Sequence, residues 1–350
     1  VTPLKGVSSL YQFQPYDQSP SFFIVGEKTN ANGSKAFREA LAKEDIDTLI
    51  AIAKEQEREG SHVLDVCTAY VGRDEVRDMN NLLFAYAQQI TIPLMIDTTE
   101  YNVAEEALKR VPGKCLINSI HFEDGGERLH KVLALCRRYG AGVVGLTIDE
   151  DGMAKTTEKK IATAERILEQ TRKYGLEDED VFIDFLTFTL GSGDEEFRKA
   201  GIETINAIKR LKQKHPRVNT ILGVSNISFG LKPSARHVLN SVFLHYALEA
   251  GLTSAIVHAG KILPESKVDK EIWEVARKLV FDERAEGYDP LVDFMSKFEN
   301  VSNQFSQKDD LTSLPVEERL KRHIIDGVKQ NLQASLAEAL KSYSAIDIIN

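Results

Sequence analysis

Cysteine is scarce in this sequence. Only three occur in 350 residues, Cys67, Cys115 and Cys136, and they are widely separated along the chain. A disulfide framework needs paired cysteines and a structural zinc site usually needs closely spaced ones, so we expect neither. A chain with so few cysteines suits a reducing compartment, and we expect it to be cytoplasmic.

Long apolar runs and dense basic stretches are also lacking. No run approaches the ~20 residues that a membrane helix needs, and residues 1–20 lack the charged start and apolar block of a signal peptide. Acidic side chains outnumber basic ones by 53 to 44, and the formal net charge is −9. Because no apolar run is long enough to span a bilayer, we expect no membrane partner. Because nucleic-acid binding needs a basic face, we expect no nucleic-acid partner either.

The composition is that of a folded protein, with 42% hydrophobic and 28% charged residues. A single (β/α)8 barrel needs ~250 residues, so 350 residues leave a remainder of roughly 60–100. The chain starts at Val1 without a methionine and stops at Asn350 within an apolar pattern. We therefore expect a piece of a longer protein.

Eight short apolar runs are separated by segments with helical periodicity. Such continuous apolar character is typical of parallel strands covered on both faces. Several of the helical segments end at a glycine, which favours the conformation of a helix C-terminus. The predicted strands are Phe22–Glu27, Val63–Cys67, Pro93–Thr98, Cys115–Ile120, Gly142–Ile148, Val181–Leu186, Thr220–Ser225 and Ser254–Ala259.

Eight strand–helix alternations predict an α/β fold with a closed (β/α)8 barrel. The alternative is an open doubly wound sheet, but no Gly-x-Gly-x-x-Gly motif follows the first strand. We predict residues 1–20 as an N-terminal extension or linker and 21–290 as the barrel. Residues 291–315 are predicted as a helix and linker, and 316–350 as a further helical segment.

The C-terminal segment carries an apolar residue every four positions, from Val316 to Leu340, along one helical face. A lone helix cannot bury such a stripe. It must pack on the barrel, self-associate, or belong to a helical domain that continues past Asn350. The ending of the chain favours the third possibility.

Polar residues occupy the C-terminal ends of the predicted strands, where barrels place their active sites. Burying such groups is costly unless they are paired or bind a ligand. One alone could be a structural hydrogen bond, but a ring of them predicts a site. They are Glu27, Asn30, Asp65, Asp97, Asn118, Asp149, Asp184, Ser225, Asn226 and His258.

Two kinds of ligand fit these residues. Asp97, Asp184 and His258 could converge on a divalent ion, as in a metal-dependent aldolase-like barrel. The mixture of carboxylates and amides better suits a flat heterocycle with an amino-pyrimidinone edge. A carboxylate accepts from two adjacent N–H groups, and an amide both donates and accepts. We therefore favour recognition of a ring edge and predict no metal.

Several segments resemble the pterin-binding family. They are Val25–Asn30, Ile96–Glu100, Ile117–Ile120, Ile183–Asp184 and Gly223–Gly230. The Gly-Glu-x-Thr-Asn and Gly-x-Ser-Asn-x-Ser-Phe-Gly motifs resemble the folate domain of cobalamin-dependent methionine synthases, and also the corrinoid/iron–sulfur protein methyltransferases. The resemblance runs in order through all eight strands. Residues 317–350 resemble the start of the helical cap that shields cobalamin.

The resemblance implies 5-methyltetrahydrofolate as methyl donor and a reduced Co(I) corrinoid as acceptor. Asp97, Asn118 and Asp184 match the residues that hold the pterin ring in the family. Asn226 matches the asparagine that reaches the ring nitrogen carrying the methyl group. We expect Asn226 to be the main catalytic residue, and Asp97, or a water that it holds, to tune protonation of that nitrogen.

Five further residues are implied in folate binding. Gly223 and Ser225 lie in the same loop as Asn226, where a small residue lets the backbone approach the ring. Arg236 matches an arginine near the folate. Glu27 and Asn30 belong to the first motif.

The chain also departs from its relatives. Dihydropteroate synthases carry Ser-Arg-Lys where Ser225, Asn226 and Ile227 stand, which favours methyl transfer over dihydropteroate synthesis. The cobalamin-ligating Asp-x-His-x-x-Gly motif is absent from the sequence. The resemblance therefore implies that cobalamin is held by a separate domain of a longer protein, which would be a partner together with the cap domain.

The predicted function is transfer of the methyl group of 5-methyltetrahydrofolate to Co(I) cobalamin, a half-reaction of methionine synthesis. Two alternatives stay open. The chain could be a folate-binding module that is silent without its cobalamin domain, or a methyltransferase that acts on a corrinoid/iron–sulfur protein.

Overall fold

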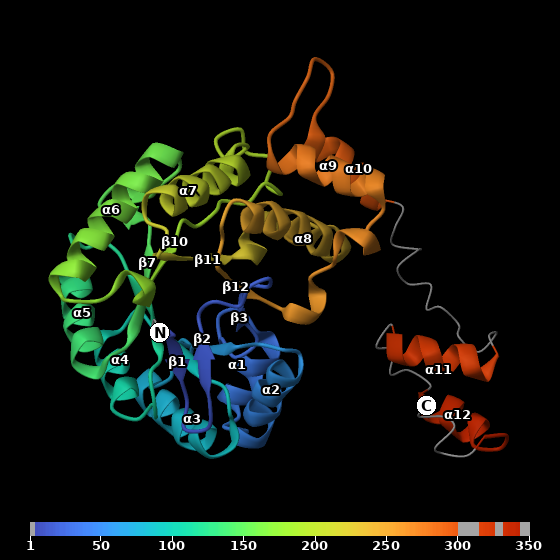
Figure 1. The fold of residues 1–350 in the computed structure, drawn as a ribbon, viewed down its shortest axis with the longest axis horizontal. Helices are drawn as coiled ribbons and strands as arrows, with labels where there is room; N and C mark the ends of the chain where they lie inside the picture. The colour runs from blue at the N-terminus through green and yellow to red at the C-terminus, as the bar shows by residue number, and fades with distance from the viewer. Residues whose placement is uncertain (1–3, 300–314, 326–331, 344–350) are drawn as a thin grey trace. The chain divides into compact units, whose positions relative to one another are not determined.

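The computed structural model describes residues 4–299, 315–325 and 332–343. Eight parallel strands form a closed barrel, as the sequence predicts, and each lies within or next to a predicted run (Figure 1). The last strand pairs with the first and closes the ring. Around the barrel the strands are β3 (Phe23–Gly26), β4 (Val63–Val66), β5 (Leu94–Asp97), β6 (Leu116–Ile120), β7 (Gly142–Leu146), β10 (Val181–Asp184), β11 (Asn219–Gly223) and β12 (Ser254–Val257).

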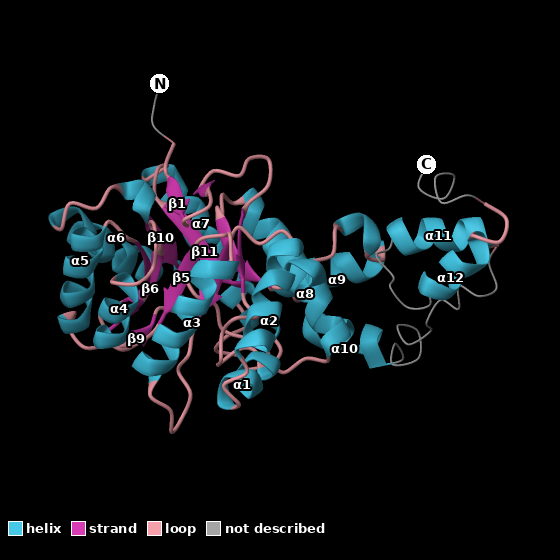
Figure 2. Cartoon of the chain, turned by 90° about the horizontal axis from the view of Figure 1, so that it is seen from below, coloured by secondary structure: helices cyan, strands magenta, loops and turns pink. Residues whose placement is uncertain are grey.

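Helices surround the strands and cover their outer faces (Figure 2). Asp45, Asp74 and Thr156 cap three of them by accepting a backbone N–H three residues on. Among the described residues, no helix is long and apolar enough to cross a membrane. The helices are α1 (Lys35–Ala42), α2 (Ile46–Arg58), α3 (Glu75–Gln89), α4 (Tyr101–Leu108), α5 (Glu127–Tyr139), α6 (Thr157–Lys173), α7 (Ala200–Lys214), α8 (Pro233–Glu249) and α9 (Lys270–Val280).

The interior of the barrel below the C-terminal ends of its strands is filled by an apolar layer. Side chains alternate along a strand, so one residue in two points inward. The buried inward residues include Phe23, Val25, Val63, Met95, Leu116, Val144, Phe182 and Ile221. This layer is packed, so a ligand can enter only above it, at the C-terminal ends of the strands.

The N-terminal segment forms an antiparallel hairpin of β1 (Gly6–Ser8) and β2 (Phe13–Pro15), which the sequence pattern does not predict. Its Val7 and Tyr16 are buried in the same apolar layer. The Tyr16 ring lies edge-on to Phe182, with 5.0 Å between the ring centroids. The hairpin therefore closes the N-terminal end of the barrel.

The chain divides into two compact units, residues 1–297 and 298–350. The predicted helix near residue 290 is α10 (Pro290–Glu299), and Lys297 pairs with Glu271 of α9 at 2.5 Å. The second unit contains α11 (Val316–Ile325) and α12 (Leu332–Ala339), both within the predicted helical segment 316–350. These two helices pack together. Of the predicted helix and linker over 291–315, residues 300–314 lie outside the described residues.

Candidate functional site

The polar residues of the barrel mouth form one layer directly above the apolar layer. Each lies two positions after a buried inward residue, so the alternation of the strand turns it inward as well. Asp97 and Asn118 are also paired neighbours on adjacent strands. The pairs are Val25 and Glu27, Val63 and Asp65, Met95 and Asp97, Leu116 and Asn118, and Phe182 and Asp184.

A single amide links two carboxylates of this layer. Asn30 Nδ2 donates to Asp65 Oδ2 and to Asp97 Oδ2, both at 2.7 Å. Burial and the neighbouring Asp97 raise the pKa of Asp65 well above its ordinary range. Burial also raises the pKa of Asp97 to about 6, although the Asn30 hydrogen bond opposes this shift. Asp97 therefore titrates close to neutral pH.

Arg128 of α5 supports the ends of β5 and β6 from behind. Its Nη2 donates to the carbonyl of Thr98 at 2.5 Å, and its Nη1 donates to the carbonyl of Ser119. Those carbonyls immediately follow Asp97 and Asn118. The guanidinium also lowers the pKa of Asp97, against the larger effect of burial. Arg128 thus fixes the backbone that carries two of the predicted pterin-binding residues.

Asp184 is buried at the end of β10 and lies apart from the Asn30 network. Its Oδ1 accepts a 2.7 Å hydrogen bond from the backbone N–H of Leu186. Burial raises the pKa of Asp184 to about 7, and both the Leu186 N–H and the Lys160 ammonium oppose the shift. Asp184 can therefore accept from a bound ring in its ionised form above neutral pH.

Asn226 is exposed and lies in the 3-10 helix η2 (Val224–Ser228), directly after β11, although the Val224, Ile227 and Ser228 side chains of this turn are buried. A Cβ added at Gly223 would stand 3.3 Å from Asn226 Nδ2, so a side chain there would crowd the amide. Arg236 of α8 holds the turn by donating to the Ser225 carbonyl and to the Ser228 hydroxyl, both at 3.2 Å. These contacts give Arg236 the role of supporting the loop that carries Asn226.

The loop after Asp184 runs beside the Asn226 turn. Thr189 Oγ1 donates to the Phe229 carbonyl at 2.6 Å, and the Leu190 N–H donates to the Ile227 carbonyl at 2.9 Å. These bonds join residues that are about 40 positions apart in sequence. The loop that begins after Asp184 therefore supports the loop that carries Asn226.

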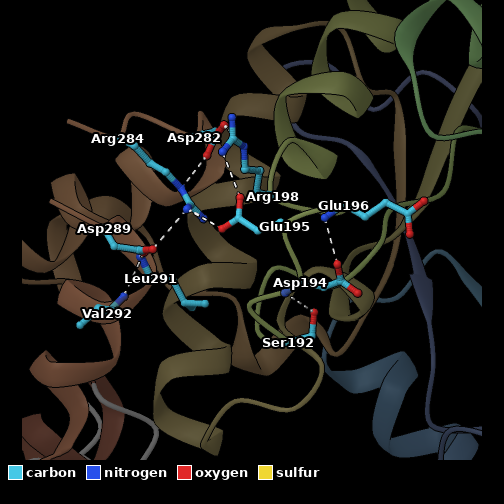
Figure 3. Close-up of polar contacts among 10 residues, drawn as sticks. All are labelled: Ser192, Asp194, Glu195, Glu196, Arg198, Asp282, Arg284, Asp289, Leu291 and Val292. Atoms are coloured by element: carbon cyan, nitrogen blue, oxygen red, sulfur yellow. Dashed lines mark hydrogen bonds and ion pairs between the residues drawn. The ribbon is translucent and has the colours of Figure 1, made fainter. Parts of the chain in front are cut away.

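The far end of this loop is tied to the segment between α9 and α10 (Figure 3). Arg284 pairs with Glu195 at 2.9 Å and with Asp289 at 3.3 Å. Arg198 pairs with Asp282 at 3.2 Å. These ion pairs connect the sequence after the last barrel strand with the loop beside the site.

Glu27 and His258 lie on the side of the mouth formed by β12 and β3. They line a small cavity together with Ser225. Burial raises the pKa of Glu27, while Lys261 and Arg236 oppose the rise. His258 Nδ1 stands 3.8 Å from Glu59 Oε2, on the outer rim.

The structure does not support the metal hypothesis for Asp97, Asp184 and His258. Within the part of the chain that the structure describes, no three His, Cys, Asp or Glu side chains are arranged to hold a metal ion. His258 faces Glu59 on the rim, whereas Asp97 is engaged by Asn30. Asp97 and Asp184 instead have different hydrogen-bond partners, which are Asn30 for Asp97 and the Leu186 N–H for Asp184.

The structure also shows where the other candidate residues from the sequence lie. Asp149 belongs to a small antiparallel hairpin that is separate from the barrel sheet, and it pairs with Lys159 at 2.5 Å, so it takes no part in the layer. Asp65 lies in the layer as a partner of Asn30, a role that its place at a strand end does not by itself predict. Arg128 and Lys160 were missed because each lies on a helix among other charged residues.

A family model for pterin binding enzymes matches residues 26–258. The chain belongs to the pterin-binding enzyme family. The match begins at the end of β3 and ends after β12, so it spans the whole barrel mouth. The matched residues therefore include the strand ends that carry the polar layer.

Two methionine synthases are similar along nearly the whole chain. The protein from Mycobacterium tuberculosis is 50% identical over 98% of the chain, and that from Mycobacterium leprae is 49% identical over 100%. The chain spans only about 30% of the length of these relatives.

Solved structures with a similar fold include two dihydropteroate synthases. The enzyme from Thermus thermophilus has a TM-score of 0.50 and 20% identity, over 73% of this chain and 94% of that one. The enzyme from Clostridium difficile, in the presence of pteroic acid, has a TM-score of 0.50 and 19% identity, over 74% and 95%. At this level of identity the likeness establishes the pterin-binding barrel fold alone.

Proposed function

We propose that this pterin-binding barrel binds 5-methyltetrahydrofolate and activates its methyl group for transfer to the Co(I) of a corrinoid. The observation that carries the proposal is that the polar residues of the mouth fall into two groups that differ in burial, which we name its first and second sides. Buried or half-buried carboxylates and an amide at the ends of β5, β6 and β10 form the first, and the exposed Asn226 amide, on the turn after β11, forms the second. Similarity to methionine synthases supports the choice of substrate.

The first side suits the amino-pyrimidinone edge of the folate. Asp97 and Asp184 accept N–H groups when ionised, and Asn118 can donate and accept at the same time. Charged hydrogen bonds in a partly dry site are stronger than neutral ones. These three residues are proposed to fix the ring and its orientation.

The second side suits activation of the methyl group. A tertiary amine is a poor leaving group, so the ring nitrogen must gain a proton or a strong hydrogen bond as the carbon–nitrogen bond breaks. Asn226 can donate to that nitrogen, or accept from it once it is protonated, but it cannot supply the proton. From the first side, Asp97, or a water that it holds, is proposed to tune protonation of that nitrogen.

Dihydropteroate synthesis is less well supported as the reaction. Where those enzymes have a lysine, this chain has Ile227, which is fully buried and offers no amine to the mouth. The neighbouring Asn226 is exposed instead.

The methyl acceptor is proposed to be a corrinoid held by another domain of a longer cytoplasmic protein. When bound there, Co(I) supplies the nucleophile, and this chain needs to bind, orient and activate the donor. Residues 316–350, within the second unit, are proposed to be the start of the helical cap that shields cobalamin. These assignments rest on the similarity to methionine synthases, of whose length this chain spans only 29% to 30%.

The test is to incubate the chain with 5-methyltetrahydrofolate and free Co(I) cobalamin and to follow methylcobalamin by its absorbance. Formation well above the uncatalysed rate is expected. Tight folate binding without turnover would favour the silent module, and turnover only with a corrinoid/iron–sulfur protein would favour the other alternative. Failure to bind folate would contradict the proposal.

A further inference from the structure

A buried lysine lies behind the site, on the side of Asp184. Lys160 of α6 is 1% exposed, which is rare for lysine unless its ammonium is satisfied. Its Nζ donates to the carbonyl of Phe185 at 2.6 Å and to that of Leu186 at 3.3 Å. The ammonium therefore binds the two carbonyls that come directly after Asp184.

These carbonyls belong to a turn that holds the Asp184 carboxylate. Leu186 has a φ of 57°, a left-handed conformation that residues other than glycine seldom adopt. This conformation accompanies the hydrogen bond from its N–H to Asp184 Oδ1. Thr204 Oγ1 also donates to the Leu186 carbonyl, at 2.8 Å. Lys160 and Thr204 together keep the turn in the shape that supports the carboxylate.

The charge of Lys160 acts on the same carboxylate. Burial lowers the pKa of Lys160 to about 8, while the nearby Asp184 and Glu203 oppose the shift. Glu203 is engaged elsewhere, because its Oε2 accepts from the Thr157 N–H and hydroxyl, both at 2.5 Å. Asp184 is thus left as the carboxylate at the barrel mouth on which the Lys160 charge acts.

We propose that Lys160 is a positioning residue for folate binding, which orients Asp184 through its turn and keeps that carboxylate ionised for the N–H groups of the ring. This inference rests on the proposed function, because Asp184 is assigned there to the pterin edge. Lys160 itself does not reach the ligand. Its effect on binding therefore passes through Asp184 and should depend on pH.

The test compares Lys160→Met with Lys160→Arg and with Lys159→Met. Lys159 is the adjacent lysine, half-exposed and paired with Asp149, so it makes a matched control. The Kd for 5-methyltetrahydrofolate is measured by titration between pH 5.5 and 9. Wild-type affinity is expected to fall as the pH is lowered through about 7, where Asp184 gains a proton.

In Lys160→Met this midpoint is expected to rise by about one pH unit, because the uncharged side chain no longer favours the ionised carboxylate. The Kd should rise about fivefold at pH 7 and by less than about threefold at pH 9. Lys160→Arg and Lys159→Met should keep the wild-type midpoint. A loss of affinity that is equal at every pH would show a merely structural role and overturn the proposal.

A second measurement separates this inference from the proposed function. The carboxyl carbon of Asp184 is titrated by NMR in the ligand-free chain, with Asp184→Asn used to assign its signal. A higher pKa in Lys160→Met supports the role of Lys160 even if folate does not bind, and an unchanged pKa overturns it. If Lys160→Met does not fold, Lys160→Gln replaces it, with the same expected and contradicting outcomes.

Discussion

The two sides of the barrel mouth differ in how their polar groups are held. Asp184 is buried, and burial raises its pKa together with that of the half-buried Asp97. Asn226 is exposed on a short turn, although Arg236 and the loop after Asp184 fix the backbone around it. Strand ends therefore carry the residues proposed to bind the ring edge, whereas a loop carries the group proposed to act on the methyl-bearing nitrogen.

The largest effect is expected from Asn226→Ala. It should lower the single-turnover rate of methyl transfer about 100-fold, because a donor aimed at a changing charge contributes mainly in the transition state. The folate Kd should change by less than about threefold. Asn102→Ala, at an exposed position on α4, is the control. If Asn226→Ala alters affinity alone, its assignment to activation is wrong.

The next largest effect is expected from Asp184→Asn. It should raise the folate Kd about 10- to 100-fold, since a hydrogen bond to a charged group contributes about 1.5–3 kcal/mol. The transfer rate at saturating folate should stay within about threefold of the wild type. Asp47→Asn, on the exposed start of α2, is the control and should leave both quantities unchanged. A large fall in the saturated rate would remove the distinction between the two sides.

The same substitution should have a smaller and opposite effect on stability. The pKa of Asp184 is raised in the folded chain, so its contribution to stability is present below the unfolded value, roughly 3.9, and is lost as the pH rises through about 7. Asp184→Asn removes the cost of a buried charge. Denaturant unfolding of the ligand-free chain should therefore show higher stability than wild type at pH 8, with a smaller difference at pH 5. A destabilised variant at pH 8 would contradict this explanation.

The smallest effect is expected from Glu195→Gln, at the far end of the loop in Figure 3. Its side chain is 68% exposed and that of Arg284 is 27% exposed. Exposed ion pairs contribute about 0–1 kcal/mol, so thermal unfolding should change by only a few degrees and the folate Kd by less than about twofold. A tenfold change in Kd would show that the ion pair controls the site.

Much of the fold and of the position of the polar layer could be predicted from sequence. Eight apolar runs fix the barrel, and the alternation within a strand places Asp97 and Asp184 on the same inner face as Met95 and Phe182. Asn118 follows by the same rule from Leu116. The strand pattern is local, so it can be read without knowing which strands are neighbours.

The supporting residues could not be predicted in this way. Lys159 and Lys160 are adjacent and look alike in sequence, yet one pairs with Asp149 near the surface and the other is buried behind Asp184. Arg128 likewise reaches backbone carbonyls of two strands from the helix that follows them. Such contacts depend on tertiary packing between elements, which the periodicity of one helix does not encode.

The most direct test of the two-sided site is the double variant Asp184→Asn/Asn226→Ala, measured for both folate Kd and single-turnover transfer rate. Independent roles predict the Kd of Asp184→Asn combined with the saturated rate of Asn226→Ala, each within about twofold. A double variant whose Kd or rate departs strongly from that combination would show that the two sides act as one unit and would contradict the division proposed here.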